Sequence, residues 1–120
     1  MSVGGHRAER VAEEIRTEVS LMLAGELKDP RLAVPVTVTE VRLRPDMRAV
    51  RVYVELAGTK QERESALAGL KKAAGFVRHE LVERLQLRRA PEVLFLLDES
   101  EEYGHHIDEL LQKVHRQDKS

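Results

Sequence analysis

The chain has 120 residues, the usual size of one domain, and its net charge of −1 argues by itself against a simple binder of polyanions. It contains no cysteine, which excludes disulfides and zinc–thiolate sites, and it has no apolar run near the roughly 20 residues that a membrane span requires. We therefore expect one cytoplasmic domain over residues 1–120, with an ordered core over about 7–115.

The charged side chains are unevenly distributed along the chain. Residues 60–89 carry eight basic and four acidic side chains, whereas residues 92–109 carry seven acidic side chains and no Lys or Arg. Such polarity can orient a protein on a polyanion. The alternative is a set of ordinary solvated faces.

The first part of the chain predicts a helix after a short disordered lead. We expect residues 1–6 to be the lead and the helix to begin at Arg7. Apolar residues from Val11 to Leu27 recur at helical spacing, and Pro30 ends the pattern, because a residue before proline is pushed out of the helical region.

A β-hairpin follows the helix. Alternating apolar residues predict strands over 34–43 and 50–56, joined by a turn at Pro45 and Asp46. The alternation is broken near Thr39 and Glu40, which predicts a bulge there.

The next segment predicts a bent pair of helices. Thr59 and Glu62 have the spacing of a capping box, so a helix begins here and runs to about Leu87. Gly75 interrupts its apolar face, and we expect the axis to bend near Ala73 to Gly75. The alternative is a single long core helix that tolerates one glycine.

The last elements are a strand over 92–98 and a helix from Ser100 to about residue 115. The order α-β-β-α-α-β-α predicts an α+β fold with a three-stranded mixed sheet, in which the third strand runs parallel to the second. Strand alternation leaves one face of the sheet polar, so the helices should cover the other.

The sequence offers no catalytic constellation. The glycine-rich phosphate-binding motifs and the nucleophile motif of hydrolases are absent. His105 and His106 with Glu109 make only a weak metal candidate, and the acidic cluster from Asp98 to Glu102 is better explained by helix capping. We therefore expect no enzyme, no metal and no cofactor.

Several motifs together resemble the ribosome-binding factor A family of bacterial ribosome-assembly proteins. They are R-V-A-E-E-I-R-T-E-V-S from Arg10, E-L-K-D-P-R-L from Glu26, V-T-V-T-E-V from Val36, P-D-M-R-A-V-R-V-Y-V from Pro45, A-A-G-F-V-R-H-E-L from Ala73, L-R-R-A-P-E-V-L-F-L-L-D-E-S from Leu87 and Y-G-H-H-I-D-E-L-L from Tyr103. The likeness covers about residues 7–115.

The resemblance implies a type II KH-like fold, α-β-β-α-α-β with a C-terminal helix. It also implies that Ala73, Ala74 and Gly75 form the A-x-G kink that replaces the G-x-x-G loop with which KH domains clamp a nucleic-acid backbone. Gly69 and Gly75 are six apart, so the G-x-x-G grip itself is missing.

The resemblance further implies a non-catalytic RNA-binding factor that associates with the small (30S) ribosomal subunit. Its partner would be the 16S rRNA, whose late maturation it would support, above all in the cold. Ribosomal proteins or a release GTPase are further candidate partners, and we expect a monomer without membrane association.

The expected RNA contacts are basic side chains of the bent helix and of the hairpin turn, together with the small residues of the kink. They are Lys71, Lys72, Arg78, Arg84, Arg88, Arg89, Arg44 and Arg48, with Ala73 and Gly75. Because phosphate contacts carry no sequence information, specificity would come from RNA shape. The alternative is a protein-interaction module that uses the acidic last helix or the exposed sheet face, and its binding would depend little on salt.

Overall fold

The computed structural model describes residues 3–27, 30–32 and 34–99, with side chains from residue 7 onward. The elements are two long helices, two short helical turns and three strands. In chain order they are α1 (Val3–Leu21), the π-helical turn η1 (Met22–Glu26), the 3-10 turn η2 (Pro30–Leu32), β1 (Val36–Leu43), β2 (Ala49–Leu56), α2 (Lys60–Leu85) and β3 (Glu92–Leu97).

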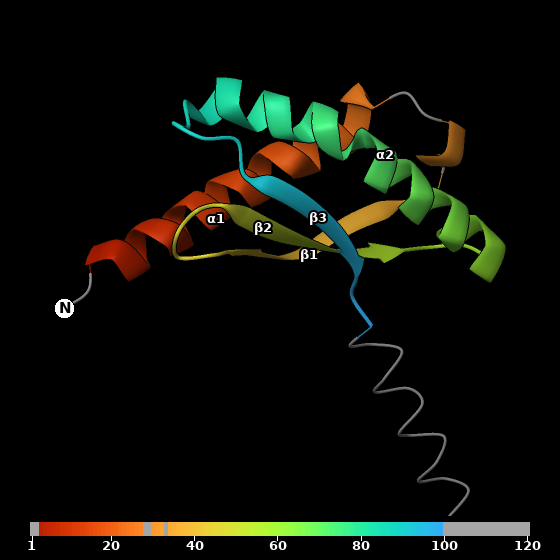
Figure 1. Cartoon of the computed structure of the whole chain (residues 1–120). Coiled ribbons are helices and arrows are strands. Elements are labelled where there is room, and N and C mark those ends of the chain that lie inside the picture. Colours follow the sequence, from red (N-terminus) through yellow and green to blue (C-terminus); the bar gives the residue numbers. More distant parts are fainter. Residues whose placement is uncertain (1–2, 28–29, 33, 100–120) are drawn as a thin grey trace, which may run out of the picture.

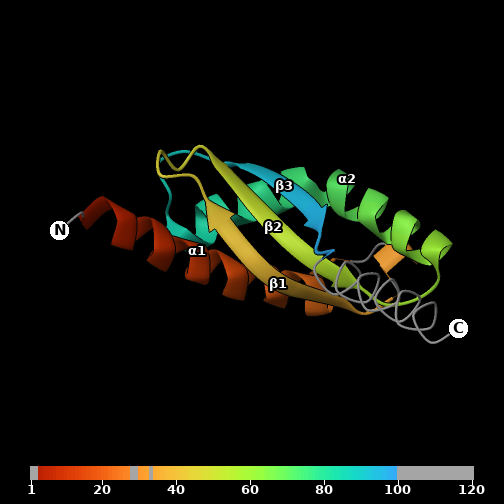
Figure 2. The same ribbon diagram turned by 90° about the horizontal axis from the view of Figure 1, so that it is seen from below.

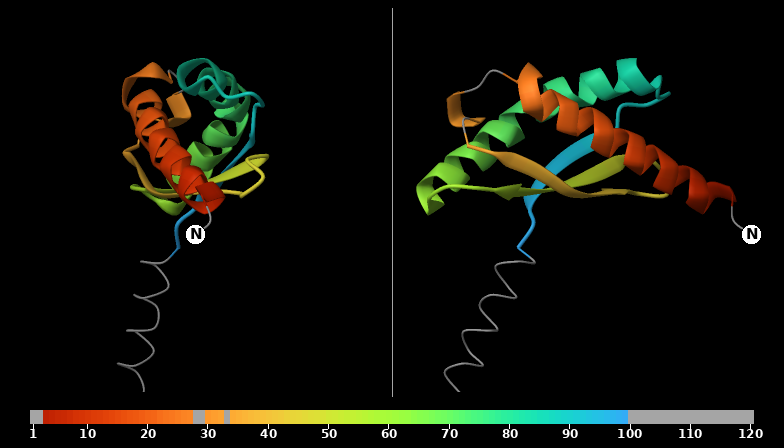
Figure 3. Two further views of the ribbon diagram at one scale, coloured as in Figure 1. Left: turned by 90° about the vertical axis from the view of Figure 1, so that its left-hand side faces the viewer. Right: turned by 180° about the vertical axis from the view of Figure 1, so that it is seen from behind.

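The three strands form one mixed sheet in the order β1-β2-β3. β1 and β2 are antiparallel, as a hairpin requires, and β3 lies parallel to β2 after the α2 crossover. Figure 1 and the end-on view in Figure 3 show α1 and α2 together on one side of the sheet. Figure 2, seen from below, shows the strands in front of both helices, so this face of the sheet has no helix over it within the described chain. The predicted mixed sheet with helices on one face is confirmed.

The predicted bulge is present in β1. Val38 pairs with Val54 and Glu40 pairs with Tyr53, so Thr39 is the extra residue. Its hydroxyl donates to the Tyr53 carbonyl oxygen at 3.3 Å. Because the bulge shifts the pleat by one residue, the apolar side chains on both sides of it can face the helices.

The core lies between the sheet and the helices and is almost entirely aliphatic. The fully enclosed side chains of its centre come from α1, η1, β2, α2 and β3 and include Ile15, Val19, Met22, Val50, Val52, Val54, Leu70, Val77, Leu81 and Phe95. No polar side chain is buried among the described residues. The charged groups are therefore left to the surface, and their placement there distinguishes one end of the molecule from the other.

α2 begins at the predicted capping box. The Glu62 backbone N–H donates to the Thr59 hydroxyl at 3.1 Å, and the Thr59 N–H donates to the Glu62 carboxylate at 2.9 Å. These bonds, first that of the Thr59 backbone, hold the pKa of Glu62 below its usual value. The helix ends at Gln86, a left-handed residue with φ 51° whose N–H donates to the Val82 carbonyl oxygen.

The prediction of two separate central helices is wrong, because α2 is continuous from Lys60 to Leu85. Figures 1 and 3 show one unbroken helix whose axis changes direction between its green and teal parts, so the helix is bent but not divided. Gly75 is exposed, and a Cβ built there would have no contact within 4 Å. A glycine of this kind costs about 1 kcal/mol relative to alanine, which the buried face on both sides of it outweighs.

The ends of the first predicted helix also differ. The helix begins at Val3, so the expected disordered lead over residues 1–6 is wrong for residues 3–6. At the other end the α-helix ends at Leu21 and is followed directly by the π-helical turn η1. This turn is closed by a hydrogen bond from the Leu27 N–H to the Met22 carbonyl oxygen at 3.1 Å. The predicted helix from Ser100 onward lies outside the described residues, as does the end of the expected core at 115.

Candidate functional site

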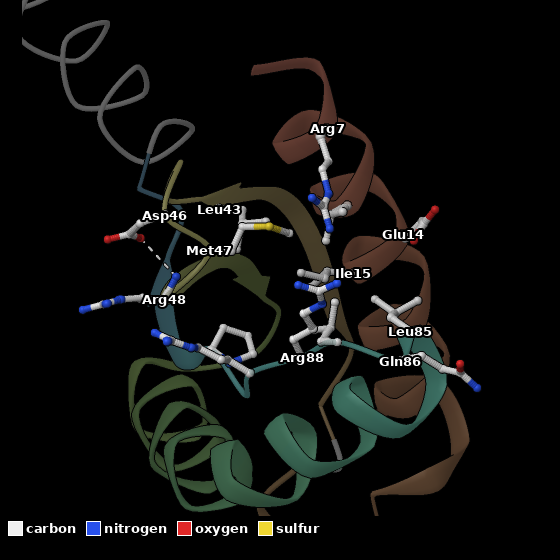
Figure 4. Close-up of a pocket in the computed structure, with 14 residues that line it drawn as sticks. Arg7, Glu14, Ile15, Leu43, Asp46, Met47, Arg48, Leu85, Gln86 and Arg88 are labelled. Atoms are coloured by element: carbon white, nitrogen blue, oxygen red, sulfur yellow. Dashed lines mark hydrogen bonds between the residues drawn. The ribbon is translucent and has the colours of Figure 1, made fainter. Parts of the chain in front are cut away.

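A cavity of about 510 Å³ opens where α1, the β1–β2 turn and the α2–β3 connection meet (Figure 4). Its base is apolar and its rim is charged. The base consists of Val11, Ile15, Leu43, Met47, Leu85, Leu87 and Pro91, and the rim of Arg7, Glu14, Asp46, Arg48, Gln86, Arg88 and Arg89. Three of the eight basic side chains that were expected to contact RNA therefore line the same cavity, namely Arg48, Arg88 and Arg89.

The β1–β2 turn is fixed by its own hydrogen bonds. The Met47 N–H donates to the Arg44 carbonyl oxygen at 2.8 Å, and the Arg48 N–H donates to the Asp46 carboxylate at 3.0 Å. Met47 has φ 61°, an uncommon value for a residue other than glycine. The second carboxylate oxygen of Asp46 pairs with Arg44 at 3.0 Å, so this acid is already engaged on both sides.

The α2–β3 connection is tied to that turn. The Glu92 N–H, at the start of β3, donates to the Arg48 carbonyl oxygen at 2.8 Å. The Leu87 N–H donates back to the Val82 carbonyl oxygen at 3.2 Å, which fixes the chain just before Arg88. Two stretches about forty residues apart in the sequence thus bring their arginines to the same end of the sheet.

The arginines of the rim have no ion pair with any carboxylate of the described chain. Arg7, Arg48, Arg88 and Arg89 are all exposed. In Figure 4 the side chains of Arg7 and Arg88 extend toward the middle of the cavity, whereas Arg48 extends outward and Glu14 points away. The cavity mouth is therefore positively charged.

The basic flank of α2 leads to this rim. Lys71 and Lys72 are exposed, and Arg78 lies seven residues after Lys71 on the same side of the helix. Arg78 donates from Nε and Nη2 to the Ala90 carbonyl oxygen at 3.3 and 3.0 Å. Because Ala90 directly follows Arg89, the flank and the cavity rim form one basic strip.

Arg84 is the expected contact that the structure separates from the others. Its side chain is only 26% exposed, and its guanidinium pairs with Glu18 at 3.1 Å, with Glu80 at 3.2 Å and with Glu26. These hydrogen bonds, first that to Glu26, raise the pKa of Arg84 above its usual value. The side chain joins α1, η1 and α2 and leaves no free charge for a phosphate.

The small residues of the expected kink lie on the continuous helix. Ala73 is half-buried, and Gly75 is exposed beside open space. Gly69 is buried in the same helix, so neither glycine belongs to a loop that could clamp a backbone. Ala73 and Gly75 are thus part of the surface of a regular helix, next to the basic side chains of Lys71 and Arg78.

The cavity and Arg7 were not predicted from the sequence. A signal was available, because Arg7, Val11 and Ile15 recur at intervals of four and share one face of α1. That spacing places Arg7 over the edge of the core. What it meets there depends on the turn at Met47 and on the α2–β3 connection, which no local pattern connects to α1.

Other chemistry is sparse in the part of the chain that the structure describes. It contains no group of three His, Asp or Glu side chains placed to hold a metal ion. None of its helices combines the length and the apolar character needed to cross a membrane. The weak metal candidate at His105, His106 and Glu109 lies outside the described residues.

Residues 7–111 match the sequence profile of the ribosome-binding factor A family. A relative named ribosome-binding factor A from Caldanaerobacter subterraneus subsp. tengcongensis is 40% identical over 113 residues, which are 94% of this chain and 93% of the relative. Another of that name, from Acetivibrio thermocellus, is 45% identical over 94% of this chain and 92% of its own length.

Solved structures of the same family have a similar fold. The solution structure of a Thermotoga maritima protein described as a ribosome binding factor A has TM-score 0.65 and 35% identity over 75% of this chain and 85% of that one. The crystal structure of the Thermus thermophilus factor has TM-score 0.58 and 31% identity, over 78% and 92%. A Thermus thermophilus homology model fitted into the cryo-EM map of a 30S complex has TM-score 0.51 and 30% identity, over 82% and 93%.

Proposed function

This chain belongs to the ribosome-binding factor A family, and we propose that it binds the small (30S) ribosomal subunit through the basic strip that runs from Lys71 to the cavity rim. A relative from Thermus thermophilus has been fitted into a map of its complex with that subunit, which supports the choice of partner. The strip would contact phosphates of the 16S rRNA.

The convergence of unpaired arginines carries this proposal. Arg7, Arg88 and Arg89 come from two distant segments and line one cavity without a carboxylate partner in the described chain. Like charges that converge repel one another, and an anion that binds between them relieves the repulsion. An RNA backbone supplies such anions at regular intervals, and release of its counterions makes binding favourable.

The surface suits recognition of RNA shape. The chain has two phenylalanines, two tyrosines and no tryptophan, so it lacks the aromatic platform with which RNA-binding sheets stack several bases. Guanidinium and ammonium groups on phosphates position a protein but do not read sequence. We infer that fit to a ribosomal surface supplies the specificity.

The biological role that follows is non-catalytic support of late 16S rRNA maturation. A protein that binds one RNA conformation more tightly than the alternatives stabilises that conformation. The stabilisation equals the difference between its binding free energies for the two. Misfolded RNA pairing is more stable in the cold, so the need for such a factor would grow as temperature falls. We propose action in the cytoplasm as a monomer, with ribosomal proteins or a release GTPase as further partners.

A second candidate function rests on the sheet face that no helix of the described chain covers. Leu94 and Leu96 are 38% and 37% exposed on that face, beside Arg51 and Tyr53 on the neighbouring strand. A protein-interaction module would use this surface. Its binding would depend weakly on salt, because apolar contacts release few ions.

The test is the salt dependence of binding to purified small subunits. Wild type should give a steep negative slope of log affinity against log salt, and replacing Arg88 and Arg89 together by Gln should reduce the slope by about one per lost phosphate contact. The matched control is Arg10→Gln, which removes an exposed arginine of α1 that does not line the cavity. A shallow wild-type slope, or equal losses in the control, would reject the proposed surface.

Charge reversal on the flank provides a second measurement. The variant Lys71→Glu with Lys72→Glu should weaken subunit binding by about tenfold or more at moderate salt while the fold is retained, because both side chains are exposed and have no partner in the described chain. Arg78 is left in place, since its bonds to Ala90 hold the α2–β3 connection. Circular dichroism checks the fold.

A further inference from the structure

The cavity has more apolar lining than an anion site requires. Phosphate binding needs donors and positive charge, which the rim supplies. Below the rim, Ile15 and Pro91 are buried, and Val11, Leu43 and Leu87 are half-buried around about 510 Å³ of open space. Concave apolar sites of this size with a few polar groups at the edge are typical of sites for small organic groups.

The charges at the mouth select an anionic occupant. Four arginines and two acids line the cavity. Asp46 is engaged by the Arg48 N–H and by Arg44, and Glu14 points away from the opening (Figure 4). Arg7 and Arg88 extend from opposite sides toward the middle of the cavity, so a group bound there lies beside both guanidinium groups.

We propose that the cavity receives one unpaired nucleotide of the bound RNA, with its base on the apolar base of the cavity and its flanking phosphates on Arg7, Arg88 and Arg89. This inference rests on the proposed function and names the ligand of the same site. A nucleobase is flat and has weakly polar faces, and in RNA recognition an unstacked base commonly stacks on an arginine plane. A base inside a duplex cannot enter, because its faces are covered by its neighbours.

The inference distinguishes this site from a purely electrostatic one. A basic strip alone would bind paired and unpaired RNA according to their phosphate spacing. A strip that ends in a cavity for a base should prefer RNA with a base that is already unstacked, since extruding a paired base costs a few kcal/mol. The preference should depend on the volume of the cavity and not on its charge.

The test compares two RNA hairpins with the same stem, one fully paired and one with a single bulged nucleotide. Wild-type protein should bind the bulged hairpin about tenfold more tightly, the equivalent of about 1.4 kcal/mol. Two variants fill the cavity without changing charge, Val11→Phe and Leu43→Phe. Each should bring the two affinities to within about twofold while the salt slope stays unchanged.

The matched control is Leu94→Phe, which makes the same change as Leu43→Phe at an exposed position on the sheet face that no helix of the described chain covers. It should keep the wild-type preference. Circular dichroism and thermal unfolding identify any variant that has lost its fold, and the wild-type comparison decides the question even if both filled variants unfold.

Equal affinity of wild type for the two hairpins, or a preference that survives filling, would overturn the inference. If small subunits are still bound with a steep salt slope in that case, the proposed function stands and only the nucleotide site is rejected. If the filled variants lose subunit binding but wild type shows no preference between the hairpins, the cavity would bind a protein segment. That result would also overturn the inference. If wild type binds neither RNA nor subunits, the proposed function itself has failed.

Discussion

Arg84 provides the first prediction at the scale of single residues. Its guanidinium lies among the carboxylates of Glu18, Glu26 and Glu80, with the side chains of Arg84 and Glu18 both 26% exposed. Replacing Arg84 by Met leaves three negative charges facing one another. We expect the free energy of unfolding to fall, by less than for a fully buried network because water still reaches the site. Urea denaturation measures the loss.

The control for this variant is Arg16→Met on α1. Arg16 is 46% exposed and 3.8 Å from Glu13, so its loss should change stability by less than about 0.5 kcal/mol. If the Arg84 variant is as stable as this control, the three carboxylates are not held together by the arginine. The Arg84 variant should bind small subunits with the same salt dependence as wild type, because Arg84 is already paired with carboxylates.

Arg84 and Arg88 also mark the limit of what the sequence predicts about individual side chains. They are four residues apart, and both were expected to contact phosphate. Glu18 and Glu26 are 66 and 58 residues away from Arg84 in the chain, so the network that neutralises it arises only from tertiary packing. The exposed position of Lys71 agrees with helical periodicity, which places it with Arg78 on one flank of the apolar face.

At the scale of elements, the N-terminal cap of α2 is open to direct measurement. The variant Thr59→Ala removes the hydroxyl that accepts from the Glu62 N–H, and we expect it to lower the free energy of unfolding by about 1 kcal/mol. Thr37→Ala is a suitable control, since Thr37 is an exposed strand residue with no side-chain bond in the described chain. Equal effects of the two changes would show that the cap contributes nothing specific.

The cap also predicts a pH dependence. The pKa of Glu62 is lowered in the folded chain, so its contribution to stability is fully present above its ordinary value of 4.5 and is lost as pH falls through the lowered value. The difference in unfolding free energy between wild type and Glu62→Gln should therefore shrink from about pH 6 to about pH 3. A difference that grows on acidification would contradict the assignment.

Gly75 allows a test of whether its flexibility matters. It lies inside the continuous α2, exposed, with no atom within 4 Å of an added Cβ. The variant Gly75→Ala should raise the free energy of unfolding by about 0.5–1 kcal/mol. Thermal unfolding measures the gain. A loss of stability would show that the helix needs a conformation there that alanine resists.

The elements were predictable where the signal is local. The capping box, the bulge at Thr39 and the pairing of β1 with β2 follow from residues close together in the sequence. The expected division into two helices at Gly75 is wrong, because the local cost of about 1 kcal/mol for that glycine competes with burial of side chains such as Leu70 and Val77, each worth about 1.5–3 kcal/mol. The first and last residues of a helix depend on weak local preferences. The observed start of α1 at Val3 therefore differs from the predicted start at Arg7.

At the scale of the whole molecule, the fold places the basic strip and the apolar sheet face on different surfaces, which the sequence pattern alone did not predict. The basic strip and the cavity lie at the end of the sheet where the helices and the hairpin turn meet (Figure 4). One face of the sheet has no helix of the described chain over it (Figure 2). The exposed apolar side chains of Leu94 and Leu96 belong to that face. The cavity joins segments around Arg7, Met47 and Arg88, whose proximity depends on the complete topology, and so it was not foreseen.

The separation yields a prediction about the sheet face. The double variant Leu94→Gln with Leu96→Gln replaces two side chains that are more than one-third exposed, so unfolding free energy should change by less than about 1 kcal/mol. If the subunit is bound through the basic strip, affinity should stay within about twofold of wild type and the salt slope should not change. The measurements are subunit binding at several salt concentrations and urea unfolding.

The opposite result would redefine the partner. A loss of affinity with an unchanged salt slope would mean that Leu94 and Leu96 contact a protein of the subunit, because burying two leucines contributes apolar free energy and displaces no counterions. The strip variants would then still flatten the slope, and the two effects would add if the surfaces act independently. Combining Arg88→Gln and Arg89→Gln with the leucine pair therefore separates one binding surface from two.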